Sequence, residues 1–393
     1  MIIKNIRLID PFFEIVSDIT IKGGKIIAIG KTDREGIDGS NLTLWPGFVD
    51  LHAHFRDPGY LYKEDLQTGS NAALAGGYTT VHLMANTKPV IDSYESYEDV
   101  MERAKAINGI HMMQVVSVTK NLRGEELIDI SSLPKEIPFL SDDGKGILSS
   151  KIIYEAMMMA KKNNKGIMVH AEDSSISSTD YRLAEDINTI RDVYLSGKTG
   201  CKLHFSHVST EDSVKAIKKG KEEGYPITCE VTPQHLYLSD VEYRVNPPIR
   251  EKKDVDFIIK GLRENIIDAI GTDHAPHSKE DKEKGAPGMV GIETSFNICY
   301  KKLVEEEGFS LSKLASLLSF NPGKILGLKN KGRLLPGYDA DFTIINLNVK
   351  DKISSKNFLS KSSNTPFEGL DVTGKILQTY VDGVLKYDKG AIL

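Results

Sequence analysis

The feature that most constrains the fold is a repeated alternation of apolar strand, loop and long helix through the middle of the chain. GYTTVHLMAN (77–86) precedes the helical stretch SYESYEDVMERAKAI (93–107), and SSKIIYEAMMMAKKNN (149–164) precedes the strand KGIMVHAED (165–173). Strands that alternate with helices usually form a parallel sheet covered by those helices. The alternating block spans residues 47–330, close to the size of a (β/α)8 barrel of roughly 250 residues with insertions. We therefore expect a TIM barrel.

Both ends of the chain read as short strands separated by turns. The N-terminal part contains IIKNIRLID, EIVSDITIKGG and KIIAIGKT, and the C-terminal part contains DADFTIINL, ILQTYVDG and GVLKYDKG. Neither part is long enough to build a sizeable core alone. We expect residues 1–46 and 331–393 to pair into one small β-sandwich domain beside the barrel domain of 47–330.

Charge and cysteine content exclude several classes of function. The chain has 50 basic and 55 acidic residues, a net charge of −5, and no basic block. This argues against nucleic acid and anionic membrane surfaces as partners. The three cysteines are far apart in sequence and form no CxxC pair, which is typical of the reducing cytoplasm. The sequence contains no stretch of eighteen apolar residues, so it predicts no membrane span.

Histidines and acidic residues stand where several predicted strands end. In a strand, residues i and i+2 point to the same side, so the HxH pair after WPGFVDL can face one metal ion. His170 is the last residue of the strand KGIMVH, and His207 is the last residue of KLHFSH. Asp273 is the last residue of IIDAIGTD, and two aspartates follow the strand IPFLS. In a barrel these positions converge on the carboxyl-terminal mouth, where such folds build active sites. The candidate metal ligands are His52, His54, Asp143, His170, His207 and Asp273.

Other residues compete for these roles or have structural explanations. Adjacent residues in a strand point oppositely, so only one of Asp142 and Asp143 can face inward. A lysine carboxylated by carbon dioxide can also bridge two metals, which makes Lys145 a third candidate. Asp50 can orient a ligand or cap a helix. We interpret the remaining histidines that we considered as structural or supporting: His82, His111, His204 and His235.

Seven segments, in order, resemble the dihydroorotases of the amidohydrolase superfamily over nearly the whole chain: GFVDLHAHFRDPGY, AALAGGYTTVHLMANTKP, SDDGKG, HFSHVST, CEVTPQHL, NPPIR and GTDHAPHSKE. HxH is shared by the whole superfamily, whereas HFRDPG, MANTKP, NPPIR and TDHAPH together are much more particular. The resemblance implies a distorted (β/α)8 barrel and a binuclear zinc site.

Carried over residue by residue, the resemblance assigns the metal ligands. It makes His52 and His54 ligands of the first zinc ion, and His170 and His207 ligands of the second. The DDG segment resembles the branch of the family in which an aspartate replaces the carboxylated lysine, and it favours Asp143 as the bridge, together with a hydroxide. Asp273 resembles the catalytic aspartate, which binds the first metal and carries a proton from the attacking hydroxide to the departing ring nitrogen.

The resemblance also implies the substrate contacts. Dihydroorotate carries a carboxylate beside a cyclic ureide, and a guanidinium fork suits that anion. The implied contacts are His54, Arg56, Asn86, Asn246, His277, Gly288 and Met289. Structural explanations stay open, because Arg56 could pair with Asp57 or Asp65 and Asn86 could make a turn before Pro89. The sequence departs from the common family pattern at Ala85, Ala171, Gln234 and Gly288.

We expect a zinc-dependent cyclic amidohydrolase that interconverts N-carbamoyl-L-aspartate and (S)-dihydroorotate, the third step of pyrimidine biosynthesis. One alternative is an allantoinase or hydantoinase, which would share the metal ligands but would not need an anion clamp. The other is a catalytically silent, dihydroorotase-like partner of aspartate carbamoyltransferase, which would be marked by missing ligands. For partners we expect a small-molecule substrate and a homodimer, with association with aspartate carbamoyltransferase as a further option.

Overall fold

The computed structural model describes the backbone of residues 1–393 and every side chain except that of Ala391. Eight short parallel strands form two sheets, β6–β7–β8 and β9–β10–β11–β12–β13. Their bounds are β6 Phe48–Ala53, β7 Tyr78–Leu83, β8 His111–Gln114, β9 Phe139–Ser141, β10 Gly166–Val169, β11 Leu203–Phe205, β12 Ile227–Val231 and β13 Ala269–Ile270. Every residue of these strands except His111, Met113 and Thr228 is buried, as expected for a parallel sheet covered on both faces.

Two parallel bridges join the sheets into a ring. Val116, beyond β8, pairs with Leu140 of β9, and Ala53 of β6 pairs with His274, beyond β13. At the second seam the His54 N–H donates to the His274 carbonyl at 2.8 Å. The eight strands therefore follow one another around a distorted barrel, which confirms the expected fold class.

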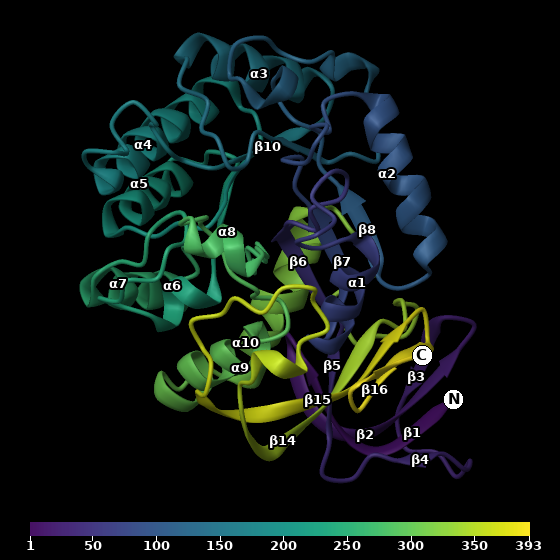
Figure 1. The fold of residues 1–393 in the computed structure, drawn as a ribbon. Helices are drawn as coiled ribbons and strands as arrows, with labels where there is room; N and C mark the ends of the chain where they lie inside the picture. Colours follow the sequence, from purple (N-terminus) through teal and green to yellow (C-terminus); the bar gives the residue numbers. More distant parts are fainter.

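Helices surround the barrel (Figure 1). Most of them begin at a polar capping residue. Their bounds are α1 Leu66–Ala75, α2 Tyr94–Ile107, α3 Ser150–Lys162, α4 Tyr181–Thr199, α5 Glu211–Glu222, α6 Pro233–Tyr237, α7 Lys252–Arg263, α8 Lys279–Glu283, α9 Ser295–Cys299, α10 Leu311–Ala315 and α11 Asn321–Ile325. Asp180 caps α4 by accepting from the Leu183 N–H, and the helix ends at Gly200, whose φ of 67° suits a glycine. No described helix is long and apolar enough to cross a membrane.

Strands from the two chain ends form one nine-stranded sheet, ordered β17–β16–β15–β14–β5–β1–β2–β3 with β4 beside β1. Their bounds are β1 Ile2–Asp10, β2 Phe13–Lys22, β3 Lys25–Ile29, β4 Ile37–Asp38, β5 Thr43–Pro46, β14 Phe342–Lys352, β15 Asp371–Val381, β16 Val384–Asp388 and β17 Ala391–Ile392. All nine lie in the two terminal segments that were expected to pair. The domain boundaries themselves stay a prediction.

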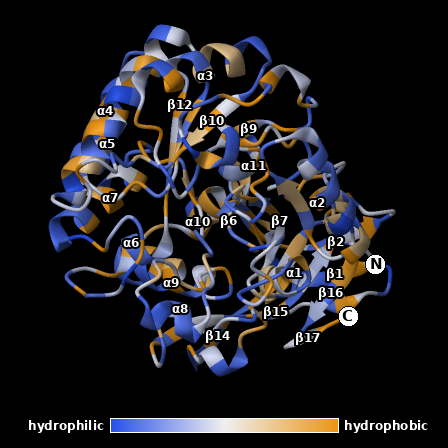
Figure 2. Ribbon diagram, turned by 45° about the horizontal axis from the view of Figure 1, so that its top comes forward, coloured by the Kyte–Doolittle hydropathy of each residue, from blue (hydrophilic) through white to orange (hydrophobic). Residues whose placement is uncertain are grey.

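The sheet closes on a core of its own. Apolar side chains of β1, β2 and β3 share one buried cluster with side chains of β5, β14 and β15. The hairpin of β2 and β3 reaches the segment before β14, where the Ile26 N–H donates to the Tyr338 carbonyl at 3.0 Å. Both termini lie in this sheet, at one side of the barrel (Figure 1). Its strands carry both hydrophobic and hydrophilic residues (Figure 2).

Candidate metal centre and active site

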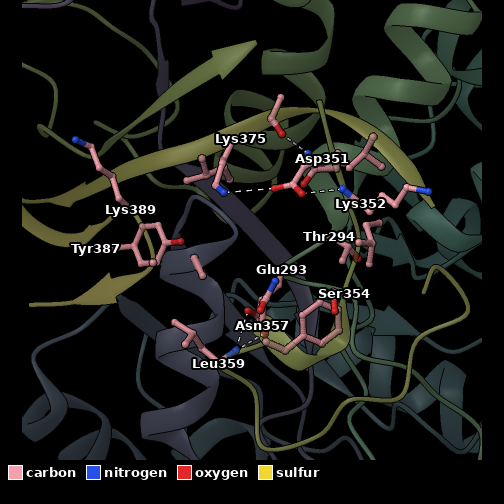
Figure 3. A pocket seen from close by; sticks show the side chains of 18 residues that line it. Glu293, Thr294, Asp351, Lys352, Ser354, Asn357, Leu359, Lys375, Tyr387 and Lys389 are labelled. Carbon is pink, nitrogen blue, oxygen red and sulfur yellow. Dashed lines mark hydrogen bonds and ion pairs between the residues drawn. The ribbon is translucent and has the colours of Figure 1, made fainter. Parts of the chain in front are cut away.

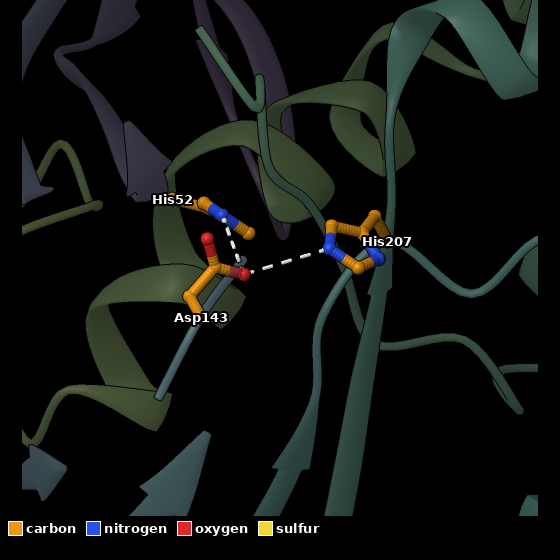
Figure 4. Close-up of side chains that lie close together, drawn as sticks. All are labelled: His52, Asp143 and His207. Atoms are coloured by element: carbon orange, nitrogen blue, oxygen red, sulfur yellow. Dashed lines mark ion pairs between the residues drawn. The ribbon is translucent and has the colours of Figure 1, made fainter. Parts of the chain in front are cut away.

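The structure brings the six predicted metal ligands together at the carboxyl ends of the barrel strands. Asp143, just beyond β9, stands at their centre. Its Oδ1 lies 3.3 Å from His52 Nε2, 3.7 Å from His170 Nδ1 and 3.6 Å from His207 Nε2, and its Oδ2 lies 3.5 Å from His54 Nε2. Figure 4 shows this carboxylate between the rings of His52 and His207. A single carboxylate thus faces all four histidines, as a group between two metal ions would.

Asp273, beyond β13, faces the same centre from the other side. Its Oδ1 lies 3.1 Å from His54 Nε2 and 3.7 Å from His52 Nε2. His52, His54 and Asp273 form one set whose donor atoms lie within 4.8 Å of one another, and His52, Asp143 and His207 form another. The two sets share His52, so the donors describe two adjacent sites.

Hydrogen bonds to the outer ring nitrogens select which nitrogen faces the centre. His52 Nδ1 contacts Glu230 Oε1 at 3.1 Å, His54 Nδ1 contacts Asn86 Oδ1 at 2.8 Å, and His170 Nε2 contacts Glu172 Oε2 at 2.9 Å. Each ring therefore donates outward and keeps a lone pair directed inward, the usual arrangement of a metal-binding histidine.

Glu230 and Glu172 were missed in the sequence. An available signal for Glu230 was a carboxylate inside the apolar strand ITCEV, and for Glu172 its position two residues after His170.

The buried donors fit a divalent metal. His52 Nε2 and Asp143 Oδ1 are buried and have no hydrogen-bond partner among the described residues, a costly state that a bound cation would relieve. Four imidazole nitrogens with two carboxylates are ligands that zinc accepts. Burial would raise the pKa of Asp273, but its contact with His54 and the nearby histidines lower it to about 2. Burial opposes ionisation of Glu230 too, yet His204 and His52 lower its pKa to about 2.

The competing candidates for the bridge lie outside the cluster. Asp142 turns away and accepts hydrogen bonds from the N–H groups of Val118 at 2.7 Å and Thr119 at 3.0 Å. The side chain of Lys145 is exposed. Adjacent aspartates therefore separate into one inward and one outward residue, as strand geometry requires.

The other polar residues considered in the sequence have local partners. Asp50 accepts from the Thr272 N–H at 2.9 Å and so orients the segment before Asp273. His204 contacts Thr228 Oγ1 at 2.8 Å, and His235 contacts the Pro247 carbonyl at 2.9 Å. Two more histidines stand apart from the centre: His111 faces Asp341 and Asp382, and His82 is buried on β7 with neither ring nitrogen hydrogen-bonded to a described residue.

Arg56 lies beside the cluster without a carboxylate partner. Its Nε donates to the Pro276 carbonyl at 3.2 Å and its Nη2 lies 3.2 Å from His277 Nε2. The two acidic residues that could have neutralised it are engaged elsewhere, because Asp57 pairs with Arg103 and Asp65 with Lys361. No described carboxylate lies within salt-bridge distance of this partly buried guanidinium. It is therefore free to bind an anion.

His277 is kept neutral beside that guanidinium. Burial lowers its pKa, and the positive charges of Arg56 and Lys63 lower it further, to about 3. Lys63 Nζ lies 3.2 Å from His277 Nδ1 and pairs with Asp281 at 3.1 Å. Lys63 is a third residue that the sequence interpretation missed, and its position far upstream of His277 gave no signal.

The remaining predicted substrate residues are connected to the site by different contacts. Asn86 joins the site through His54. Asn246 is partly buried in the loop before Pro247, and Pro247 lies with His170 and His207 around one small cavity. The Gly288 N–H already donates to the Arg244 carbonyl at 3.1 Å, and the Met289 carbonyl accepts from the Ala275 N–H at 2.8 Å. These two residues fix the loop beyond β13 in addition to any contact with a ligand.

A larger cavity of about 370 Å³ lies elsewhere, where the barrel meets the terminal sheet. Figure 3 shows its lining, which includes Glu293, Tyr387 and several lysines. Two of its charges have partners within the cavity wall: Lys375 pairs with Asp351 at 3.4 Å, and Glu293 accepts from the Leu359 N–H at 2.9 Å. We interpret it as part of the junction between the domains.

Comparison with known proteins agrees with this geometry. The model of the Amidohydrolase family matches residues 43–386. The chain belongs to the amidohydrolase family. Among curated relatives of this amidohydrolase, the dihydroorotase of Clostridium botulinum (strain Eklund 17B / Type B) is 48% identical over 99% of this chain and 100% of its own length. The dihydroorotase of Lactobacillus johnsonii is 39% identical over 99% of both chains.

Solved structures share the whole fold of this amidohydrolase. The L-hydantoinase (dihydropyrimidinase) from Arthrobacter aurescens superposes with a TM-score of 0.90 at 26% identity and covers 100% of this chain and 97% of its own. The dihydropyrimidinase from Brevibacillus agri NCHU1002 gives a TM-score of 0.88 at 24% identity over 100% and 96% of the two chains. The barrel with its terminal sheet is thus a fold that both proteins share with this chain.

Proposed function

We propose that this chain is a dihydroorotase, which interconverts N-carbamoyl-L-aspartate and (S)-dihydroorotate in pyrimidine biosynthesis. The curated relatives that carry this name match it over nearly its full length. The observation that carries the proposal is Arg56, a partly buried guanidinium that has no carboxylate partner among the described residues and lies beside the histidine cluster. Dihydroorotate carries a carboxylate that would pair with this guanidinium, whereas the ring of a simple hydantoin does not.

Each residue has a part in this proposal. His52, His54 and Asp273 would hold one zinc ion, His170 and His207 a second, and Asp143 would lie between them. Bound there, the two ions supply a Lewis acid for the ring carbonyl and an activated water at neutral pH. Asp273, ionised because its pKa is low, accepts a proton from the attacking water. It returns that proton to the ring nitrogen that leaves, and biosynthesis runs these steps in reverse.

The substrate would be oriented by its carboxylate. The Arg56 fork binds the anion, neutral His277 and the Asn86 amide supply further hydrogen bonds, and Asn246 with the backbone of Gly288 and Met289 contacts the ring. His54 Nδ1 is hydrogen-bonded to Asn86 Oδ1 at 2.8 Å. This bond would fix the position of Asn86, a proposed contact of the substrate carboxylate, relative to His54, a proposed metal ligand.

The test is ring opening of L-dihydroorotate by the purified protein, with allantoin and a simple hydantoin as parallel substrates in the same zinc-containing buffer. We expect strong preference for dihydroorotate. Preference for an uncharged ring would move the function to the allantoinases or hydantoinases. Silence on all three substrates with metal bound would favour a non-catalytic partner of aspartate carbamoyltransferase. The cytoplasmic location and the homodimer expected above belong to the same proposal.

A further inference from the structure

The outer face of α4 is apolar. The exposed residues of this helix are Leu183, Ile187, Ile190, Tyr194 and Lys198, so only the last carries a charge. The exposed fractions of the four apolar residues are 47%, 40%, 55% and 58% in chain order. Helices on a protein surface normally direct polar side chains outward and apolar ones inward. Helix α4 departs from that rule along three turns.

Polar contacts on the inner face fix the rotation of α4. Glu185 accepts from the Ser209 N–H at 2.8 Å and from Arg250 Nη2 at 3.0 Å. At the start of the helix, the Tyr181 hydroxyl donates to Glu172 Oε2 at 2.7 Å. Because turning α4 would break these buried bonds, the apolar stripe has to face outward.

The stripe continues onto the neighbouring helix. Leu148, Tyr154 and Met158, in and just before α3, are 45%, 44% and 46% exposed. The two segments are fastened side by side, since Arg191 Nη1 donates to the Leu148 carbonyl at 2.9 Å and Lys161 Nζ to the Thr199 carbonyl at 2.7 Å. Hydrophobic residues colour both helices at the outer edge of the barrel (Figure 2).

We call the seven residues Leu148, Tyr154, Met158, Leu183, Ile187, Ile190 and Tyr194 the α3–α4 patch. With about half of each side chain exposed it covers several hundred Å², as much as the largest apolar patch expected on a monomer.

The spacing along α4 makes the patch complementary to itself. The steps from Leu183 to Ile187, Ile190 and Tyr194 are 4, 3 and 4 residues, a series that reads the same in both directions. Two copies of α4 laid antiparallel across a two-fold axis would place Leu183 opposite Tyr194 and Ile187 opposite Ile190. A symmetric dimer requires this kind of self-matching surface.

The charges at the two ends of α4 match in the same arrangement. Exposed Asp180 precedes the first apolar residue and exposed Lys198 follows the last. In the antiparallel pair each Lys198 would meet the Asp180 of the second copy, so two ion pairs would flank the apolar centre. The positive end of each helix dipole would also face the negative end of the other. We propose that the α3–α4 patch is the contact between two copies of this chain.

This contact would couple assembly to the active site, whichever amide the enzyme hydrolyses. The inner face of α4 supports His170 through Tyr181 and Glu172, and it supports the loop that follows His207 through Glu185. A partner that covers the outer face would hold the helix against the barrel.

The first experiment measures molar mass by sedimentation velocity over a dilution series. We expect the wild-type chain to be a dimer at micromolar concentration. Ile187→Asp combined with Ile190→Asp should raise the dimer dissociation constant at least about 100-fold, because buried centres of interfaces carry most of the affinity. Val16→Asp is the matched control, since Val16 is 62% exposed on β2, outside the patch, and this variant should stay dimeric.

A second variant keeps the test valid if the double variant fails to fold. Lys198→Glu leaves the apolar stripe intact but opposes Asp180 with a like charge, and it should weaken the dimer measurably while circular dichroism stays unchanged. A monomeric wild type, or dimers that survive both Ile187→Asp with Ile190→Asp and Lys198→Glu, would overturn the proposal.

A crosslink tests the register. The native cysteines are buried, so a short bis-maleimide should join an equimolar mixture of Ile187→Cys and Ile190→Cys chains far more than either alone. Equal crosslinking in all three samples would exclude the antiparallel arrangement.

Discussion

At the scale of single residues, the site depends on side chains whose directions are fixed by their backbone conformation and by neighbouring residues. His207 and Asp273 have φ angles of 36° and 46°, and Arg56 has 59°. Residues other than glycine rarely adopt this left-handed region, and such strain persists only where the surroundings enforce it. In Asp273 the strain is held by the preceding Thr272, whose N–H donates to buried Asp50. The backbone after these strands is therefore bent so that its side chains reach the centre.

Asp273 should be indispensable for turnover. Replacing it with alanine removes the group proposed to carry the proton, so we expect the rate of dihydroorotate ring opening to fall by about 100- to 10,000-fold. The thermal unfolding midpoint and circular dichroism control for the fold, and elemental analysis reports whether metal is still bound. Near-normal turnover in Asp273→Ala would refute the proposed role.

Arg56 should determine preference for a charged substrate. A charge-assisted hydrogen bond contributes about 1.5–3 kcal/mol, so Arg56→Gln should lower kcat/KM for dihydroorotate about 10- to 100-fold. Hydrolysis of an uncharged ring should change little. Arg103→Gln is the matched control, because Arg103 pairs with Asp57 and Asp99 and should leave both reactions nearly unchanged. Equal losses on charged and uncharged rings would make Arg56 a structural residue.

At the scale of elements, loops from distant parts of the chain are tied together by buried carboxylates. Glu293, before α9, accepts from the N–H groups of Leu359 at 2.9 Å and Ser360 at 3.1 Å. It thereby fastens the loop between β14 and β15 to the barrel. Burial raises the pKa of Glu293 to about 7, despite these hydrogen bonds.

The contribution of Glu293 should depend on pH. The folded chain holds this proton more tightly than the unfolded chain, where glutamate has its ordinary pKa of about 4.3. Stability from this group is therefore fully present below the unfolded value and is lost as the pH rises toward about 7. Glu293→Gln mimics the protonated form and should gain up to about 3 kcal/mol over wild type at alkaline pH.

Urea unfolding at acidic and alkaline pH measures this difference. The advantage of Glu293→Gln over wild type should grow as the pH rises through the interval between the two pKa values. A constant difference at every pH would show that the titration does not contribute.

At the scale of the whole molecule, the metal centre joins parts of the barrel that are far apart in sequence. Its proposed ligands lie in β6 or just beyond β6, β9, β10, β11 and β13, so metal bound there would crosslink five strand ends. An ion that binds only the folded chain stabilises it by about 4 kcal/mol at a free concentration a thousandfold above its dissociation constant.

Removing metal with a chelator should abolish activity and lower the thermal unfolding midpoint, and added zinc should restore both. His52→Ala is the control, because it removes the histidine shared by both donor sets and should respond less to zinc. If neither the thermal unfolding midpoint nor the rate of ring opening changed on chelation, the result would contradict a metal centre.

The sequence by itself determined the class of fold and the ligand types. Alternation of strand and helix predicts a parallel barrel, because each helix both connects two successive strands and covers the apolar outer face of the sheet. Since carboxyl ends of parallel strands share one edge, residues such as His170 and Asp273 could be assigned to one site from position alone.

Only the tertiary structure decided which side chains support that site and which surface stays open. The contact of Glu230 with His52 and the pairing of Asp57 with Arg103 join residues that are distant in sequence. The outward direction of Asp142 depends on its hydrogen bond from the Val118 N–H, which is also distant in sequence. The outward apolar face of α4 follows from polar anchors such as Glu185 on its inner face. Periodicity shows that a helix has two faces, but only packing shows which of them the molecule buries.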